Sequence, residues 1–126
     1  MLEDASYWNP DDLGFISNGP VALGHLMLWN TPESREEQLP RQKKHMIITT
    51  DARLDNRVEL GEKLEIDREK LAVTTDSELI LASYHKWADQ CPNHLLGDFA
   101  FAIWNMEKRE LFCARDHLGI KPLYFS

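Results

Sequence analysis

A short polar segment follows a run of apolar residues near the middle of the chain. The stretch MIITTDARLDNR, residues 46–57, begins like a buried strand and then becomes polar at Asp51, Arg53, Asp55 and Asn56. Such side chains at the end of a strand either line a pocket or form the solvated end of a sheet. In the second case Asp51 and Arg53, two positions apart, share a face and pair with neighbours. The residues alone leave both interpretations open.

Other residue types that could support self-contained chemistry are scattered. The five histidines show no HxH or HExxH spacing, so no metal site is predicted. The sequence has no phosphate-binding loop, no GxGxxG and no GxSxG elbow that would mark a nucleophilic serine. Cys91 and Cys113 form no CxxC motif, and we expect both to be buried free thiols.

Composition indicates one compact domain without a membrane span. The chain has 126 residues, of which 43% are apolar and 28% charged, enough for one core that buries roughly two thirds of the unfolded surface. The longest apolar run, Phe99 to Trp104, is about a third of the length that crosses a bilayer. The N-terminus has no basic region followed by an apolar stretch. We expect a cytoplasmic protein, and a net charge of −7 argues against nucleic acid as a partner.

The first half of the chain is predicted to contain strands. GFIS and PVALGHLMLW flank Asn18-Gly19, a pair that takes positive φ readily, which predicts a tight hairpin. Residues 30–44, NTPESREEQLPRQKK, are charged and contain two prolines, so a surface loop is expected. Residues 45–54 return to the pattern of a strand.

Helical spacing begins at Asn56. A first helix is expected through Val58, Leu60 and Leu64, and a second over residues 68–73. The clearest helix lies in residues 74–90, ends before Pro92 and can be capped by Thr75 or Asp76. Its inward face is predicted to consist of Leu79, Ile80, Ala82, Ser83 and Trp87.

The last third of the chain is predicted to return to strands. PNHLLG, residues 92–97, is expected to form one more helical turn. Three strand candidates follow, joined by turns at 106–110 and 117–119: DFAFAIWN, ELFCARD and IKPLYFS. Since strands and helices are grouped rather than alternating, the fold class is α+β with antiparallel sheets.

Six segments in order resemble the class II glutamine amidotransferase domain of the asparagine synthase family, over essentially the whole chain. They are WNPDDLGF, VALGHLMLW, DARLDNRVEL, TTDSELILASYHKW, LLGDFAFAIWN and LFCARDHLGIKPLYF. Within the family, LWNTPES and DARLDNR resemble the branch that closes the macrolactam ring of lasso peptides. The resemblance implies an Ntn-hydrolase-like αββα sandwich, with two antiparallel sheets between helical layers.

The family's nucleophile is an N-terminal cysteine, and the resemblance implies that it is absent here. The free α-amine beside that thiol acts as its base, whereas this chain begins Met1-Leu2. WNPDD, Trp8 to Asp12, occupies the place of the family's Arg-Gly-Pro-Asp-Gly, and PLYFS ends before the last expected strands. We therefore expect residues 1–126 to be a truncated amidotransferase type 2-like domain, incomplete at its first and last strands.

The glutamine pocket of the family can be followed position by position. The arginine that binds the glutamine carboxylate corresponds to Met27, and the Asn-Gly-Glu strand end with its oxyanion hole corresponds to Asp51, Ala52 and Arg53. Asp51 has no donor for an oxyanion, and loss of one donor typically costs about 3 to 4 kcal/mol. Asp76 of TDSE, which in the family holds the substrate's α-amine, is retained. No catalytic residue and no metal ligand is predicted.

Two further hypotheses concern charged side chains. Asp51, Arg53 and Asp76 could form an internal ion-pair network or bind another ligand, such as a peptide or a glutamine-like molecule. Arg115 and Asp116 are predicted to be a buried pair that fixes a turn beneath the site.

Three functions fit these expectations. The first is an amidotransferase-like domain without glutaminase activity that acts as a scaffold or docking domain for a synthetase domain or protein partner. ATP and Mg²⁺ are expected only for the missing synthetase domain, so none is expected for this chain. The second is a fragment of an active glutamine-hydrolysing asparagine synthase or lasso-peptide cyclase whose nucleophile and ligase domain lie outside the chain. The third is a stand-alone interaction module, a homodimer formed through an unpaired sheet edge.

Overall fold

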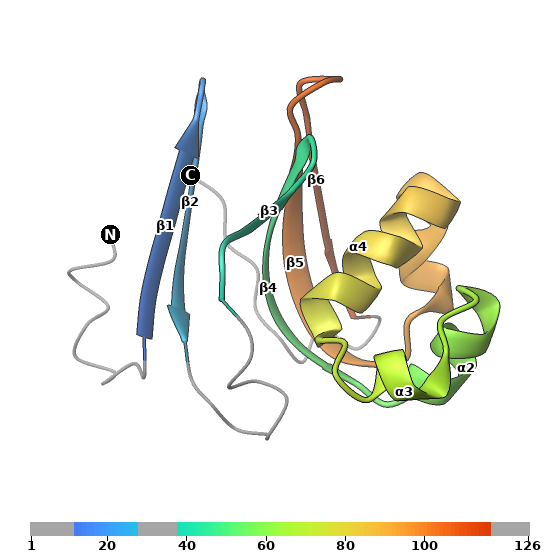
Figure 1. Ribbon diagram of the computed structural model, residues 1–126. Helices are drawn as coiled ribbons and strands as arrows, with labels where there is room; N and C mark the ends of the chain where they lie inside the picture. Colours follow the sequence, from blue (N-terminus) through green and yellow to red (C-terminus); the bar gives the residue numbers. More distant parts are fainter. Residues whose placement is uncertain (1–11, 28–37, 117–126) are drawn as a thin grey trace.

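Two antiparallel sheets and a group of helices make up this computed structural model, which describes residues 12–27 and 38–116 (Figure 1). The strands are β1 (Asp12–Asn18), β2 (Val21–Met27), β3 (Arg41–Lys43), β4 (Met46–Leu54), β5 (Gly97–Asn105) and β6 (Glu110–Arg115). The helices are α2 (Arg57–Lys63), α3 (Arg68–Leu71), α4 (Asp76–Trp87) and the 3₁₀ helix η3 (Ala88–His94). The predicted strand IKPLYFS and the turn at 117–119 lie outside the described residues.

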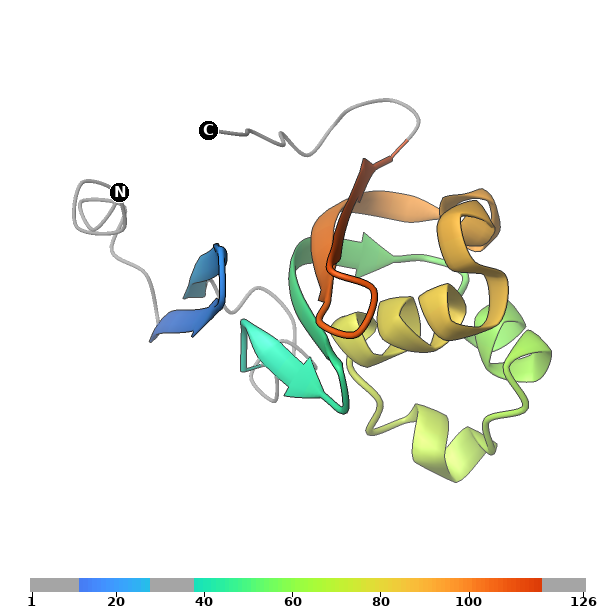
Figure 2. The ribbon, with the colours of Figure 1, turned by 90° about the horizontal axis from the view of Figure 1, so that it is seen from above.

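The sheets and helices form layers. One sheet pairs β1 with β2, and the other has the order β3-β4-β5-β6. In both ribbon views the β1–β2 hairpin lies on one side of the four-stranded sheet and the helices lie on the other (Figures 1 and 2). This α+β arrangement is consistent with an Ntn-hydrolase-like sandwich and confirms the predicted fold class.

The β1–β2 hairpin forms where it was predicted, with its loop one residue later. Asn18 pairs with Val21 at the end of the ladder, so Gly19 and Pro20 are the two loop residues. Gly19 has φ +55°, a conformation that glycine adopts without strain. Asn18 thus belongs to the strand rather than to the centre of the turn.

Strand β3 was missed, because it lies within the predicted loop of residues 30–44. Arg41 pairs with Ile48 and Lys43 with Met46 across an antiparallel ladder. The strand is short, charged and at the edge of the sheet, which is how proteins commonly protect an edge. Its sequence shows no alternation of apolar and polar residues, and the strand forms because it pairs with β4.

The N-terminus of α4 carries a capping box. The Thr75 hydroxyl oxygen accepts a hydrogen bond from the Glu78 N–H at 3.3 Å, and Oε2 of Glu78 accepts from the Thr75 N–H at 2.8 Å. The other oxygen of the same carboxylate, Oε1, accepts from Nη1 of Arg41 at 2.9 Å. Glu78 therefore joins the start of α4 to the edge strand β3.

Helix boundaries differ slightly from the prediction. The second short helix, α3, ends at Leu71, two residues before the predicted limit. Helix α4 ends at Trp87 because Ala88 takes φ +50°, and the chain continues as η3, which contains Pro92. The helical turn predicted for residues 92–97 therefore begins earlier, at Ala88, and is a 3₁₀ helix.

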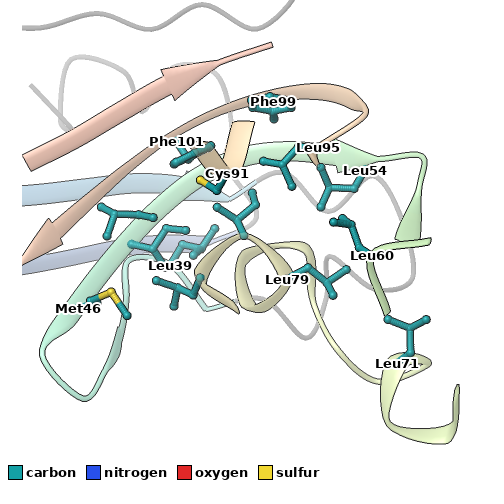
Figure 3. Packing of buried hydrophobic residues seen from close by; sticks show 14 residues of the cluster. Leu39, Met46, Leu54, Leu60, Leu71, Leu79, Cys91, Leu95, Phe99 and Phe101 are labelled. Carbon is teal, nitrogen blue, oxygen red and sulfur yellow. The ribbon is translucent and has the colours of Figure 1, made fainter. Parts of the chain in front are cut away.

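The core lies between α4 and the four-stranded sheet (Figure 3). Leu79, Ile80 and Ser83 of the predicted helix face are buried, whereas Ala82 and Trp87 are half-buried. Every residue of β5 from Phe99 to Asn105 is buried, so both faces of this strand are covered. None of the helices in residues 12–27 and 38–116 is long and apolar enough to span a membrane.

Candidate functional site

Asp76, which the resemblance assigns to the glutamine pocket, is the first residue of α4 and is paired with Arg57. Nη1 of Arg57 donates a hydrogen bond to Oδ1 of Asp76. Nη2 of Arg57 donates to the carbonyl oxygens of Leu71, at 3.1 Å, and Thr74. The guanidinium therefore joins the start of α2, the end of α3 and the start of α4.

The Arg57–Asp76 pair is largely removed from solvent. The two side chains are 23% and 21% exposed, and the fork of donors on arginine suits simultaneous bonding to a carboxylate and carbonyls. The position also favours an acid, because Asp76 lies in the first turn of α4, at the positive end of the helix dipole. A cationic ligand would therefore meet a carboxylate that already has a cationic partner.

Sequence reasoning missed Arg57, although one signal was present. Arg57 is the first residue of α2, and a cation is unfavourable at a helix N-terminus. Such a residue is expected to have a specific anionic partner elsewhere. The identity of that partner, Asp76, is not evident locally because 19 positions separate the two residues.

Asp51, Ala52 and Arg53, which the resemblance aligns with the family's oxyanion strand end, lie near the end of β4. Asp51, Ala52 and Arg53 pair with Ala100, Phe99 and Asp98 of β5. Asp51 and Arg53 are exposed, whereas Ala52 is half-buried and packs against the core. As predicted for positions two apart, Asp51 and Arg53 share a face of the sheet, opposite to that of Ala52.

Arg53 pairs with Asp55 rather than with Asp76, so it does not join Asp76 to the end of β4. Nε of Arg53 lies 3.9 Å from Oδ1 of Asp55, and the two side chains are 75% and 60% exposed. Asp76 pairs instead with Arg57. The Arg53–Asp55 contact is the kind of surface pair that contributes little to stability.

Met27 is the last residue of β2 and pairs with Asp12 in the ladder. Its side chain lies outside what the structure describes, so its place relative to Asp76 stays a prediction. Among the described residues, no group of three or more His, Cys, Asp or Glu side chains could hold a metal ion.

Comparisons with known proteins identify the family. A family described as "Glutamine amidotransferase domain" matches residues 26–126. The chain belongs to this family. Over 129 residues, all of the chain, it is 32% identical to "Asparagine synthetase [glutamine-hydrolyzing] 3" of Bacillus subtilis (strain 168). It is 36% identical over 108 residues, 84% of the chain, to a "Putative asparagine synthetase [glutamine-hydrolyzing]" of Mycobacterium bovis.

A fungal relative is also similar. The amidotransferase domain is 37% identical over 139 residues, 99% of its length, to "Amidase chry2" of Gibberella zeae. The aligned regions cover 21% of the Bacillus relative, 15% of the Mycobacterium relative and 19% of the Gibberella relative. The chain thus spans about a fifth or less of the length of these relatives.

Asp116 of the amidotransferase domain is buried and holds the end of β6 against β5. Its Oδ2 accepts a hydrogen bond from the Phe99 N–H at 3.2 Å, and its own N–H donates to the Phe99 carbonyl at 2.7 Å. The predicted burial of Asp116 is confirmed, whereas the turn at 117–119 lies outside the described residues. The prediction of Arg115 as its buried partner is wrong, because Arg115 is exposed at the end of the strand.

The two thiols of the amidotransferase domain are free, as predicted. Cys91 is buried, as predicted, whereas Cys113, which was also predicted to be buried, is half-buried. Burial raises the pKa of the Cys91 thiol to about 12, with the nearby Asp89 carboxylate adding to the shift. Burial also raises the pKa of Cys113. Since the thiolate is the nucleophile, neither cysteine is poised to attack a substrate.

Iodoacetamide is expected to leave Cys91 unmodified in the folded chain at about pH 8 and to modify it in urea. With a pKa of about 12, only about one thiol in ten thousand is ionised at that pH. The protonated thiol contributes fully to stability below about pH 8.5, where an unfolded cysteine ionises, and this contribution is lost as the pH rises toward 12. Peptide mapping by mass spectrometry measures the modification, and rapid labelling of native Cys91 would contradict the prediction.

Proposed function

We propose that this amidotransferase domain does not hydrolyse glutamine and instead serves as a scaffold on which a synthetase domain docks. The observation that carries the proposal is the Arg57–Asp76 ion pair. The family resemblance assigns Asp76 to the α-amine of glutamine. In this chain an internal guanidinium already satisfies the carboxylate.

A substrate ammonium would have to compete with Arg57 for the Asp76 carboxylate. It would have to displace a guanidinium that also donates to the Leu71 and Thr74 carbonyl oxygens. Displacement would leave those acceptors and a partly buried arginine without partners, at a penalty of about 1 to 3 kcal/mol for each unsatisfied group. Glutamine binding at this position is therefore disfavoured.

The replaced oxyanion position supports the same proposal. By the resemblance Asp51 corresponds to the family's asparagine donor, and it offers carboxylate oxygens, which accept hydrogen bonds, in place of an amide N–H. A negative charge at this position opposes the developing oxyanion of amide hydrolysis rather than stabilising it.

The contacts that stabilise the sandwich support the scaffold role. The capping box of α4, the buried strand β5 and the Asp116 anchor hold the sandwich together. The named asparagine synthetase relatives are much longer than this chain, so a synthetase domain is the natural partner. ATP and Mg²⁺ would act there and not in this domain.

Glutamine hydrolysis provides the test. Purified chain incubated with glutamine is expected to release no ammonia above a blank, and calorimetry is expected to show no heat of glutamine binding. The binding measurement matters because it does not require a nucleophile. Release of ammonia, or saturable glutamine binding that Asp76→Asn abolishes, would overturn the proposal. Asparagine synthetase 3 of Bacillus subtilis, which is named glutamine-hydrolysing, serves as the positive control.

A second candidate is a part in a lasso-peptide cyclase, which LWNTPES and DARLDNR favour. In such a ligase the precursor's own α-amine attacks the activated side chain, so no ammonia is needed and loss of the glutamine pocket has no penalty. A gene for a small precursor peptide beside this one would support this candidate, whereas an amino-acid biosynthesis operon would contradict it.

A further inference from the structure

A cavity of about 550 Å³ lies at the end of the core opposite to the Arg57–Asp76 pair. Three segments line it: the turn between β3 and β4, residues 64–66 between α2 and α3, and the second half of α4. Figure 3 shows Met46, which lines the cavity, at the other end of the core from Leu71, whose carbonyl accepts from Arg57. The cavity thus lies away from the Arg57–Asp76 pair.

The rim of this cavity is basic although the chain carries a net charge of −7. Lys43 and Lys44 stand on the hairpin side and Lys86 stands on the α4 side. Glu65 is the acidic residue among those that line it, so ammonium groups outnumber carboxylates. His45 and His85 also line the cavity, and Nδ1 of His45 lies 3.7 Å from Oε2 of Glu107.

The lysines of the rim have few competing partners. Within residues 12–27 and 38–116, Lys43 and Lys44 form no ion pair with another side chain. Lys86 donates to the Lys63 carbonyl and lies 5.4 Å from the centre of the Trp87 ring. An ammonium has three donors, so Lys86 is held in place while donors remain for a ligand.

The floor of the cavity is apolar. Met46 and Leu81 belong to the core and are 7% and 2% exposed, and Leu64 and Ile66 are half-buried beside them. The volume falls in the range of pockets that accept small molecules or a few peptide residues. An occupant that matches this surface must combine negative charge with an apolar group.

We propose that this cavity binds an acidic peptide segment of a partner protein. An apolar side chain of the segment covers Met46 and Leu81, while flanking carboxylates meet Lys43 and Lys44 on one wall and Lys86 on the other. The placement of cations on two walls, with an apolar floor between them, favours a peptide over a small inorganic anion, because such an anion would use neither the second wall nor the floor. Because the rim is basic, charge complementarity requires a negatively charged partner segment.

The test uses fluorescence anisotropy with the full chain and a labelled peptide of alternating Glu and Leu residues. We expect saturable binding that weakens with salt and falls at least tenfold when Gln replaces Glu in the peptide. Lys43→Glu is expected to weaken binding about tenfold by replacing attraction with repulsion. Lys70→Glu, at an exposed position on α3 at the other end of the core, is the matched control and leaves affinity unchanged.

Two further measurements test the floor of the cavity. Ala82→Leu fills the cavity and is expected to weaken peptide binding, and NMR signals of the Met46 and Leu81 methyl groups are expected to shift when the peptide binds. Equal binding of the Gln peptide, equal effects of Lys43→Glu and Lys70→Glu, or unshifted methyl signals would overturn the proposal. So would inorganic phosphate competing as strongly as the peptide, or preferential binding of a labelled oligonucleotide.

Discussion

Arg57→Ala lowers the free energy of unfolding by about 2 to 4 kcal/mol, because it leaves a partly buried carboxylate and two carbonyl oxygens without their guanidinium partner. The lower limit reflects the residual exposure of the pair, 23% for Arg57 and 21% for Asp76. Urea unfolding followed by circular dichroism measures the change as a shift of the midpoint at constant slope.

Two controls separate the ion pair from simple loss of side-chain volume. Arg57→Lys keeps the charge but cannot reach Asp76, Leu71 and Thr74 together, so an intermediate loss is expected. Asp76→Asn is expected to lower the free energy of unfolding less in the Arg57→Ala background than in the unchanged chain, because the partner of Asp76 is already absent. If Arg57→Ala lowers the free energy of unfolding by less than about 0.5 kcal/mol, the pair does not hold α2, α3 and α4 together.

Phe101→Ala is expected to destabilise the chain by about 3 to 5 kcal/mol through loss of buried area and formation of a cavity. Phe101 is 1% exposed, and its ring centre lies 5.9 Å from that of Phe99 and 6.0 Å from that of Phe112. Thermal and urea unfolding measure the loss.

The controls for Phe101 differ in volume and burial. Phe101→Leu retains most of the apolar volume and is expected to cost less than about half as much as Phe101→Ala. Leu111→Ala, at a position that is 47% exposed on β6, is expected to change stability by no more than about 0.5 kcal/mol. Similar losses for Phe101→Ala and Leu111→Ala would mean that the Phe101 ring is not part of the central core.

Elements with a strong local signal could be predicted from the sequence. The run FAFAIW lacks polar alternation, as expected for a strand covered on both faces, and β5 is such a strand. Thr75 followed three positions later by Glu78 is the pattern of a capping box, and α4 begins with one. Where the chain itself encodes the boundary of an element, local reasoning was sufficient.

Elements that depend on distant partners could not be predicted. Strand β3 has only three residues and exists because β4 offers backbone groups to pair with. The Arg57–Asp76 pair also depends on distant partners, because the fold brings the N-termini of α2 and α4 together. The family resemblance assigns Asp76 to the glutamine pocket, but it does not reveal the contact that Arg57 makes with this residue.

The carboxylate of Glu78 has a consequence for local motion. Its two oxygens bond the first turn of α4 and the edge strand β3 at the same time. Fraying of the helix end and detachment of the strand each break a bond to this one side chain. The two events are therefore coupled, and this border of the molecule opens and closes as one cooperative unit rather than as two independent ones.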